Sequence, residues 1–230
     1  MNAFFNQSVF FGAFISLLAY EIGLFVKRKF HKAVFNPLLI SIIIVMVVLS
    51  GLHIDYEVYN EGGKYISYLL TPATVCLAIP LYQQLELLKN NWKAIMAGTL
   101  AGILTTMVTV LAFSILFGLS HSDYVTLLPK SITTAIGMGV AEELGGDVTI
   151  TAAVIIVTGV LGNIIAELVC KVFRIQEPVA RGIGIGSASH AIGTAKAIEM
   201  GEIEGAMSSL AIAVAGLLTV FAATIFSYVR

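Results

Sequence analysis

Residues 94–120 read AIMAGTLAGILTTMVTVLAFSILFGLS, the longest uncharged stretch of this sequence. A helix needs about 20 predominantly apolar residues to span a bilayer, because the hydrocarbon core is roughly 30 Å thick. This stretch is therefore long enough to cross a membrane. Five further uncharged runs of similar length occur elsewhere in the chain. Together they predict spanning segments at residues 1–20, 33–52, 65–85, 94–120, 148–166 and 205–229.

The composition of the whole chain agrees with this interpretation. Hydrophobic residues make up 58% of the 230 residues, and only 12% are charged, whereas a soluble domain carries roughly 25% charged residues. This excludes a cytosolic enzyme and a secreted domain, and it predicts an all-α, polytopic membrane protein organised as one domain over residues 1–230. The net charge of -1 comes without a basic tail, so nucleic acid is not an expected partner. Two cysteines are too few for a disulfide framework.

Two apolar stretches do not resemble simple lipid-facing helices. Residues 131–141 are short, and residues 182–195 (GIGIGSASHAIGTA) are rich in glycine and polar groups. Irregular backbone is tolerated at membrane depth only where protein or water covers it, so such segments tend to line a cavity. We expect a re-entrant segment over 127–145 and a crossing over 182–197.

Basic residues set the expected orientation, because cytoplasmic loops carry an excess of Lys and Arg. The loop KRKFHK at 27–32 is the densest basic loop, and residues 171–181 form another. If both are cytoplasmic, the chain has about seven crossings plus the re-entrant segment, and Arg230 lies inside. The Gly, Ala and Ser residues of 94–120 and 205–229 permit close helix contacts, within one chain or in a homo-oligomer.

A short internal similarity suggests a repeat. The residues AGILT at 101–105 recur as AGLLT at 215–219, and an interrupted, polar segment precedes each copy. In the expected topology the two copies are inverted, with halves at about 36–119 and 148–229. Interrupted segments in matching positions of two halves indicate a transporter binding site. Chance similarity between helices rich in small residues is the alternative.

Three stretches hold nearly all the polar groups expected at membrane depth: 70–74, 128–134 and 186–190. Each combines Pro or Gly with Ser or Thr, which is typical of a helix that begins inside the membrane. Because a helix N-terminus attracts anions, these stretches favour a site for a small carboxylate. The candidate substrate-binding residues are Thr74, Lys130, Ser131, Thr133, Thr134, Ser187, Ser189 and His190. For Thr74, a kink capped by its own hydroxyl is an equal alternative.

Two residues are candidates for proton coupling. His190 has a side chain that titrates near physiological pH, and Glu167 shares a helix face with Asn163, although that pair could equally form a packing contact. No cluster of His, Cys and carboxylates has metal-ligand spacing, so neither a metal nor another cofactor is expected. Ser187 or Ser189 beside His190 could suggest a hydrolase, but adjacent residues on one turn rarely align as nucleophile and base. We therefore expect no enzymatic activity.

The same polar stretches resemble the signatures of the LrgB/CidB family, bacterial membrane proteins called antiholin-like. The resemblance covers essentially the whole chain. One departure is Ala135, where the family pattern has a proline after the paired threonines, and it puts the re-entrant segment in question. The segments that carry the resemblance are LTPATVCLAIPLYQQ (70–84), LLPKSITTAIGMGVA (127–141), RGIGIGSASHAIGTAKA (181–197) and GEIEGAMSSLAIAVAGLLT (201–219).

The resemblance implies a multi-pass protein of the bacterial cell (inner) membrane that works beside a small holin-like partner of the LrgA/CidA type. It implies two competing functions. One is transport of small monocarboxylates, since relatives are associated with pyruvate and a plastid relative exchanges glycolate and glycerate. The other is an antiholin-like pore or regulator that modulates murein hydrolase activity and autolysis. The anion site read from the residues favours transport.

Overall fold

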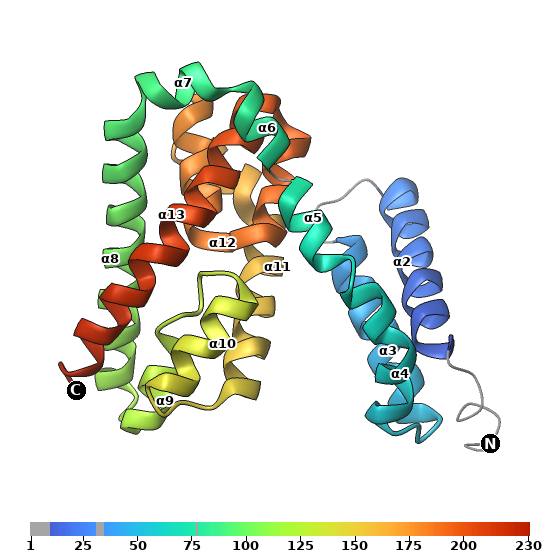
Figure 1. Cartoon of the computed structure of the whole chain (residues 1–230). Coiled ribbons are helices and arrows are strands. Elements are labelled where there is room, and N and C mark those ends of the chain that lie inside the picture. Colours follow the sequence, from blue (N-terminus) through green and yellow to red (C-terminus); the bar gives the residue numbers. More distant parts are fainter. Residues whose placement is uncertain (1–9, 31–34, 77) are drawn as a thin grey trace. The chain divides into compact units, whose positions relative to one another are not determined.

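The computed structural model describes residues 10–30, 35–76 and 78–230, and within these ranges all regular structure is helical (Figure 1). The chain divides into two compact units, an N-terminal unit (Met1–Cys76) and a C-terminal unit (Leu77–Arg230). The C-terminal unit holds all but one of the candidate site residues.

The N-terminal unit contains α2 (Phe11–Phe30), α3 (Pro37–Gly51), α4 (Tyr56–Ser67) and α5 (Leu70–Cys76). Helix α3 begins where the Asn36 side chain accepts hydrogen bonds from the backbone N–H groups of Leu38 and Leu39, at 2.9 and 3.3 Å. Helix α2 packs closely on α4, because a Cβ on Gly12 would lie 1.8 Å from the Tyr59 carbonyl oxygen. Small residues thus set the helix contacts of this unit.

The C-terminal unit contains eight helices in its described residues. Three helical stretches of the described chain are long and apolar enough to cross a membrane, namely Leu85–Leu116, Val148–Val172 and Glu202–Ser227. The eight helices are α6 (Ala78–Gln83), α7 (Leu85–Asn90), α8 (Trp92–Leu116), α9 (His121–Leu127), α10 (Thr134–Glu143), α11 (Val148–Val172), α12 (Pro178–Met200) and α13 (Glu202–Ser227).

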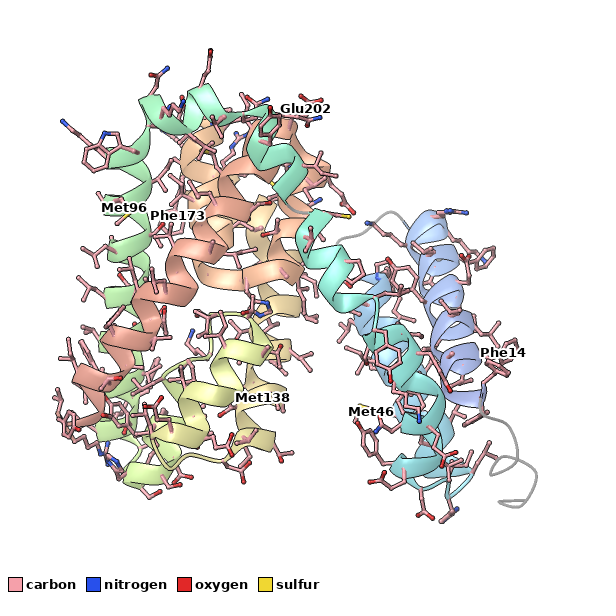
Figure 2. The ribbon with its side chains drawn as sticks, viewed as in Figure 1. Phe14, Met46, Met96, Met138, Phe173 and Glu202 are labelled. Carbon is pink, nitrogen blue, oxygen red and sulfur yellow. The ribbon has the colours of Figure 1, made fainter. Side chains whose placement is uncertain are left out.

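Helices α8 and α13 run in the same direction. Near their beginnings, Ile95 of α8 and Met207 of α13 share one buried cluster. Near their ends, the Arg230 guanidinium donates to Ser114 Oγ and to the Leu119 carbonyl. We call the end where both helices begin the Arg181 end, because the Arg181 side chain lies there against α13, and the opposite end the His121 end. In Figure 2 the labelled Glu202 of α13 and Met138 of α10 lie toward these two ends.

Residues 121–143 form a first hairpin that enters and leaves at the His121 end. The Ser122 hydroxyl donates to the Gly145 carbonyl at 3.2 Å, and the backbone N–H of Asp147 donates to Thr126 Oγ1 at 2.8 Å. The two ends of the segment are therefore side by side, which confirms the return of the chain expected over 127–145. The return does not need a proline in place of Ala135, because Pro129 and the turn after it already break the helix.

Residues 178–200 form a second hairpin, which enters and leaves at the Arg181 end. His190 has φ 43° and ψ -145°, which divides α12 into a first arm (178–189) and a second arm (191–200). Arg181 Nη1 lies 3.5 Å from Glu204 Oε1, and a Cβ on Gly201 would lie 2.5 Å from Glu204 Oε2. Because both ends of α12 lie beside Glu204, the crossing expected over 182–197 is wrong.

Glycine allows both arms of α12 to pack on α13. A Cβ on Gly182 would lie 2.5 Å from the Glu204 carbonyl oxygen, and one on Gly186 would lie 2.3 Å from the Ser208 carbonyl oxygen. From the other side, a Cβ on Gly205 of α13 would lie 2.8 Å from Ile198 of the second arm. This double contact makes α12–α13 the most extensive helix pair in the described chain.

The structure also contradicts two other predictions about the topology, namely the side on which Arg230 lies and the relative direction of the two similar segments. Arg230 lies at the His121 end, opposite Arg181, and not on the same side as predicted. The copies at 101–105 and 215–219 lie on parallel helices, which contradicts the inverted relation expected for them. The structure instead shows two hairpin-and-helix pairs of opposite direction, 121–172 and 178–227, because α11 leaves from the His121 end and α13 from the Arg181 end.

The expected spans in the first third of the chain are interrupted. The segment 65–85 is divided among four short helices, with Pro72 in α5 and Pro80 in α6. In the described part of the segment 33–52, the helix is α3, which has 15 residues. The span expected at 1–20 falls partly outside the described residues. The predicted count of seven crossings included the segment 182–197 and is therefore not confirmed, whereas organisation as a single domain stays a prediction.

Candidate substrate site at the hairpin tips

The tip of the first hairpin is a turn that ends in the beginning of α10. The Lys130 N–H donates to the Leu127 carbonyl at 3.2 Å, and the Ile132 N–H donates to the Pro129 carbonyl at 3.3 Å. Thr133 is the N-cap residue of α10 in extended conformation, and its side chain makes no capping hydrogen bond. The first N–H groups of α10 therefore keep their capacity to bind an anion.

Lys130 contributes a positive charge to this tip. Its Nζ donates to Ser131 Oγ at 3.1 Å, and Ser131 is buried. No carboxylate among the described residues lies within ion-pair distance of this ammonium. An ionisable group without a counter-charge at such a position is costly unless a ligand or water compensates it.

The tip of the second hairpin is His190, which is 3% exposed. Its Nε2 lies 2.9 Å from the Ile155 carbonyl oxygen of α11. Because a carbonyl oxygen only accepts, Nε2 carries the hydrogen, and Nδ1 is the nitrogen that can take up a proton. Thr194 Oγ1 donates to the His190 carbonyl at 3.0 Å and lies 2.7 Å from Ser208 Oγ of α13. These bonds fix the break in the helix.

Both hairpins meet α11 within about one helical turn. A Cβ on Gly137 of the first hairpin would lie 2.4 Å from the Ile155 side chain, and a Cβ on Gly159 would lie 2.5 Å from the His190 ring. The first hairpin also reaches the middle of α13, because a Cβ on Gly216 would lie 3.1 Å from Ile136. The N-terminus of α10 and that of the second arm of α12 thus approach the same region from opposite ends, each with the positive end of its dipole.

The structure places the other predicted residues less centrally. The Ser187 hydroxyl donates to the Ile183 carbonyl at 2.7 Å, and a Cβ on Gly102 would lie 2.9 Å from it, so Ser187 forms part of the α8–α12 contact. Thr134 is the first residue of α10 and is half-buried. Thr74 belongs to the N-terminal unit, and its side chain lies outside the described side chains.

Glu167 lies near the Arg181 end and away from both tips. Its carboxylate is 3.3 Å from Lys196 Nζ and 3.5 Å from Lys171 Nζ, and its side chain is half-exposed. Lys196 also lies 3.5 Å from Glu199. The Glu167–Lys196 pair links α11 to the second arm of α12.

Sequence reasoning missed three features of this region. The Thr194–Ser208 bond and the Arg181–Glu204 pair join the two arms of α12 to α13. Thr99 of α8 has a buried hydroxyl without a hydrogen-bond partner in the described chain. The position of Thr194, one turn after His190 in GSASHAIGTA, was the available signal for the first feature, and no sequence signal existed for the other two.

This architecture defines a class: a helical membrane protein in which two broken hairpins, entering from opposite ends, bring helix N-termini together between long helices. The described residues hold no group of three or more His, Cys, Asp or Glu that could bind a metal ion.

Comparison with known proteins gives the family. The chain belongs to the LrgB-like family, whose model matches residues 16–229. It is 38% identical to the antiholin-like protein LrgB of Bacillus mycoides (strain KBAB4), over 96% of each chain. The identity and coverage are the same for the proteins of that name from Bacillus cereus (strain B4264) and Bacillus anthracis (strain CDC 684 / NRRL 3495). No solved structure matches the chain.

Proposed function

We propose that this protein acts as an antiholin-like protein of the bacterial cell membrane and that its molecular activity is the transport of small monocarboxylates. The names of the relatives favour the antiholin-like role over the transport role, and they name no substrate. The transport role rests on one observation, the Lys130 ammonium at a helix N-terminus with no carboxylate beside it.

A small carboxylate suits the first hairpin tip on chemical grounds. Its charge would compensate Lys130, and its oxygens would accept hydrogen bonds from Ser131, from Thr133 and from the first N–H groups of α10. Pyruvate, glycolate and glycerate each carry one carboxylate and a neighbouring carbonyl or hydroxyl oxygen. That second oxygen suits the hydroxyl donors of the tip. Among the described residues of this tip, no comparable set of acceptors is offered to a cation.

His190 is the proposed proton-coupling residue, because its Nδ1 is the basic nitrogen of the second tip. Glu167 is a weaker proposal, since two ammonium groups stabilise its ionised form. Movement of the hairpins relative to α8, α11 and α13 would expose the tips alternately to the two ends. A partner of the LrgA/CidA type and assembly into a homo-oligomer belong to the same proposal.

A pore or regulator without a carboxylate site is the second candidate, and the relatives' names support it. The two candidates differ in kinetics, because a carrier saturates and a pore does not. The test is counterflow of labelled pyruvate into vesicles that contain the purified protein, with and without the small partner. Saturable counterflow supports transport. Passage of unrelated solutes without saturation would contradict it and support the pore.

A further inference from the structure

A groove of about 210 Å³ runs between α11 and the first arm of α12. On α12 the lining positions recur in pairs four residues apart, from 180 and 181 to 188 and 189, so one face of the arm lines the groove over its whole length. At 1.5 Å per residue this corresponds to about 12 Å. The lining residues are Gly162, Ile165, Ala166, Val169, Cys170, Ile175, Ala180, Arg181, Gly184, Ile185, Ala188 and Ser189.

The two ends of the groove differ chemically. At the outer end lies Arg181, which donates from Nε to the Ile175 carbonyl at 2.8 Å and pairs with Glu204. At the inner end lies Ser189, the residue before His190. Ser189 is buried, with 4% of its surface exposed. Between these ends the walls are formed by small and aliphatic residues.

Glycine at two positions keeps the groove open. A Cβ on Gly162 would lie 1.8 Å from Ser189 Oγ, so the hydroxyl points at this part of the wall. Gly184 has nothing within 4 Å of its Cβ position, so a side chain there would occupy the groove without striking the backbone. The groove thus leads from a guanidinium at the Arg181 end to the buried Ser189 hydroxyl beside the tip of the second hairpin.

We propose that this groove is the route by which a small anion reaches the hairpin tips from the Arg181 end, with Ser189 as its innermost hydrogen-bond donor. The inference rests on the proposed function, because it assigns an access path to the same site. Arg181 attracts the anion at the outer end, and the Ser189 hydroxyl replaces part of its hydration at the inner end. The hairpins enter from opposite ends, so this route serves one side of the membrane only.

Two thiols report on the groove. Cys170 lines its outer part and is the native reporter once Cys76→Ser removes the other cysteine. The variant S189C, made in a chain that also carries Cys76→Ser and Cys170→Ser, reports on its inner end. The reagent is the membrane-impermeant anion 2-sulfonatoethyl methanethiosulfonate, added to one side of sealed vesicles. Labelling of K171C and of H121C in parallel chains identifies the two sides, because both native side chains are exposed.

The expected result is labelling of both thiols from the side that labels K171C, and none from the side that labels H121C. Gly184→Leu is expected to abolish labelling of the S189C thiol. Gly139→Leu is the matched control, because Gly139 also has nothing within 4 Å of its Cβ position and lies in the first hairpin, outside the groove. It should leave the labelling rate unchanged.

Reaction of the thiols with an apolar maleimide dissolved in the bilayer, but not with the anionic reagent, would overturn the proposal, because a lipid chain would then fill the groove. Equal labelling in the Gly184→Leu and Gly139→Leu chains would also overturn it. If the anionic reagent reaches the S189C thiol and Gly184→Leu blocks it, the route stands even where the vesicles show no pyruvate counterflow. In that case it is the transport function that fails.

Discussion

The two hairpins reach the same turn of α11 by different means. The first hairpin breaks its helix with a proline and a turn, and it carries a charge at the tip, Lys130. The second breaks at one residue, His190, whose φ and ψ angles are rare for non-glycine residues. Glycines allow both of its arms to pack closely on α13. The first hairpin therefore supplies electrostatic attraction, and the second supplies a fixed shape.

The largest expected effect concerns the glycine contacts of the second hairpin. Gly186→Leu would place a side chain against the Ser208 backbone, so we expect the free energy of unfolding to fall by about 3 kcal/mol. The matched change in the first hairpin, Gly139→Leu, should raise the free energy of unfolding by at most about 1 kcal/mol, because leucine favours the helix more than glycine does. Thermal unfolding in detergent measures both. Equal stability of the two variants would remove the distinction between the hairpins.

The next effect concerns the charge of the first hairpin. Lys130→Gln keeps a polar side chain but removes the ammonium, so we expect the Kd for pyruvate to rise by about 10- to 100-fold, the value of a charge-assisted hydrogen bond. Lys171→Gln is the control, since that lysine is exposed and paired with Glu167. Titration calorimetry of the purified protein provides the measurement. Unchanged affinity in the Lys130 variant would show that the tip does not bind the carboxylate.

A smaller effect separates the two tips by their backbone. Alanine normally stabilises a helix more than glycine does, but the positive φ of His190 reverses that order. We expect His190→Gly to be more stable than His190→Ala by about 1–2 kcal/mol. Ser131 does not have a positive φ, so at this position we expect Ser131→Ala to be more stable than Ser131→Gly. Chemical denaturation of the four variants tests this, and the same order at both tips would refute it.

The smallest effect concerns the beginning of the first hairpin. Asp123 and Ser120 form a capping box, and the hydrogen bonds from the Ser120 side chain and backbone hold the pKa of Asp123 below its ordinary value of 3.8. A carboxyl with a lowered pKa contributes stability above the ordinary pKa, and that contribution is lost as the pH falls through the lowered one. In Asp123→Asn this part of the pH dependence should be absent. Unfolding temperatures of both proteins across the acidic range would measure the difference, and identical profiles would contradict it.

The long helices could be predicted from the sequence, because a helix that spans lipid needs a long uncharged run such as 94–120. The first hairpin was also predictable, since the proline Pro129 and the charged Lys130 indicate that the helix is interrupted there. The second hairpin was not, because its reversal depends on the backbone angles of His190 and on contacts of Gly182 and Gly186 with a helix that follows later in the chain. Neither the backbone angles nor the glycine contacts can be predicted by counting apolar residues.

The same reasoning explains the candidate site. Lys130, Ser131, Ser189 and His190 were identifiable because ionisable and hydroxyl groups are rare in such an apolar sequence. The role of Ser187 was not, because its hydroxyl is satisfied within its own arm, a detail that depends on rotamer and not on residue type. The direction of the AGILT and AGLLT copies was predicted wrongly for one reason, the miscounted crossing between them.

The broken backbone at His190 has a consequence for the order of assembly in the cell. The His190 carbonyl accepts from Thr194 within the same hairpin, but Thr194 also bonds to Ser208 and Gly186 packs on the Ser208 backbone, and Ser208 belongs to α13, which is synthesised only afterwards. The second hairpin therefore reaches its final packing only once α13 is present.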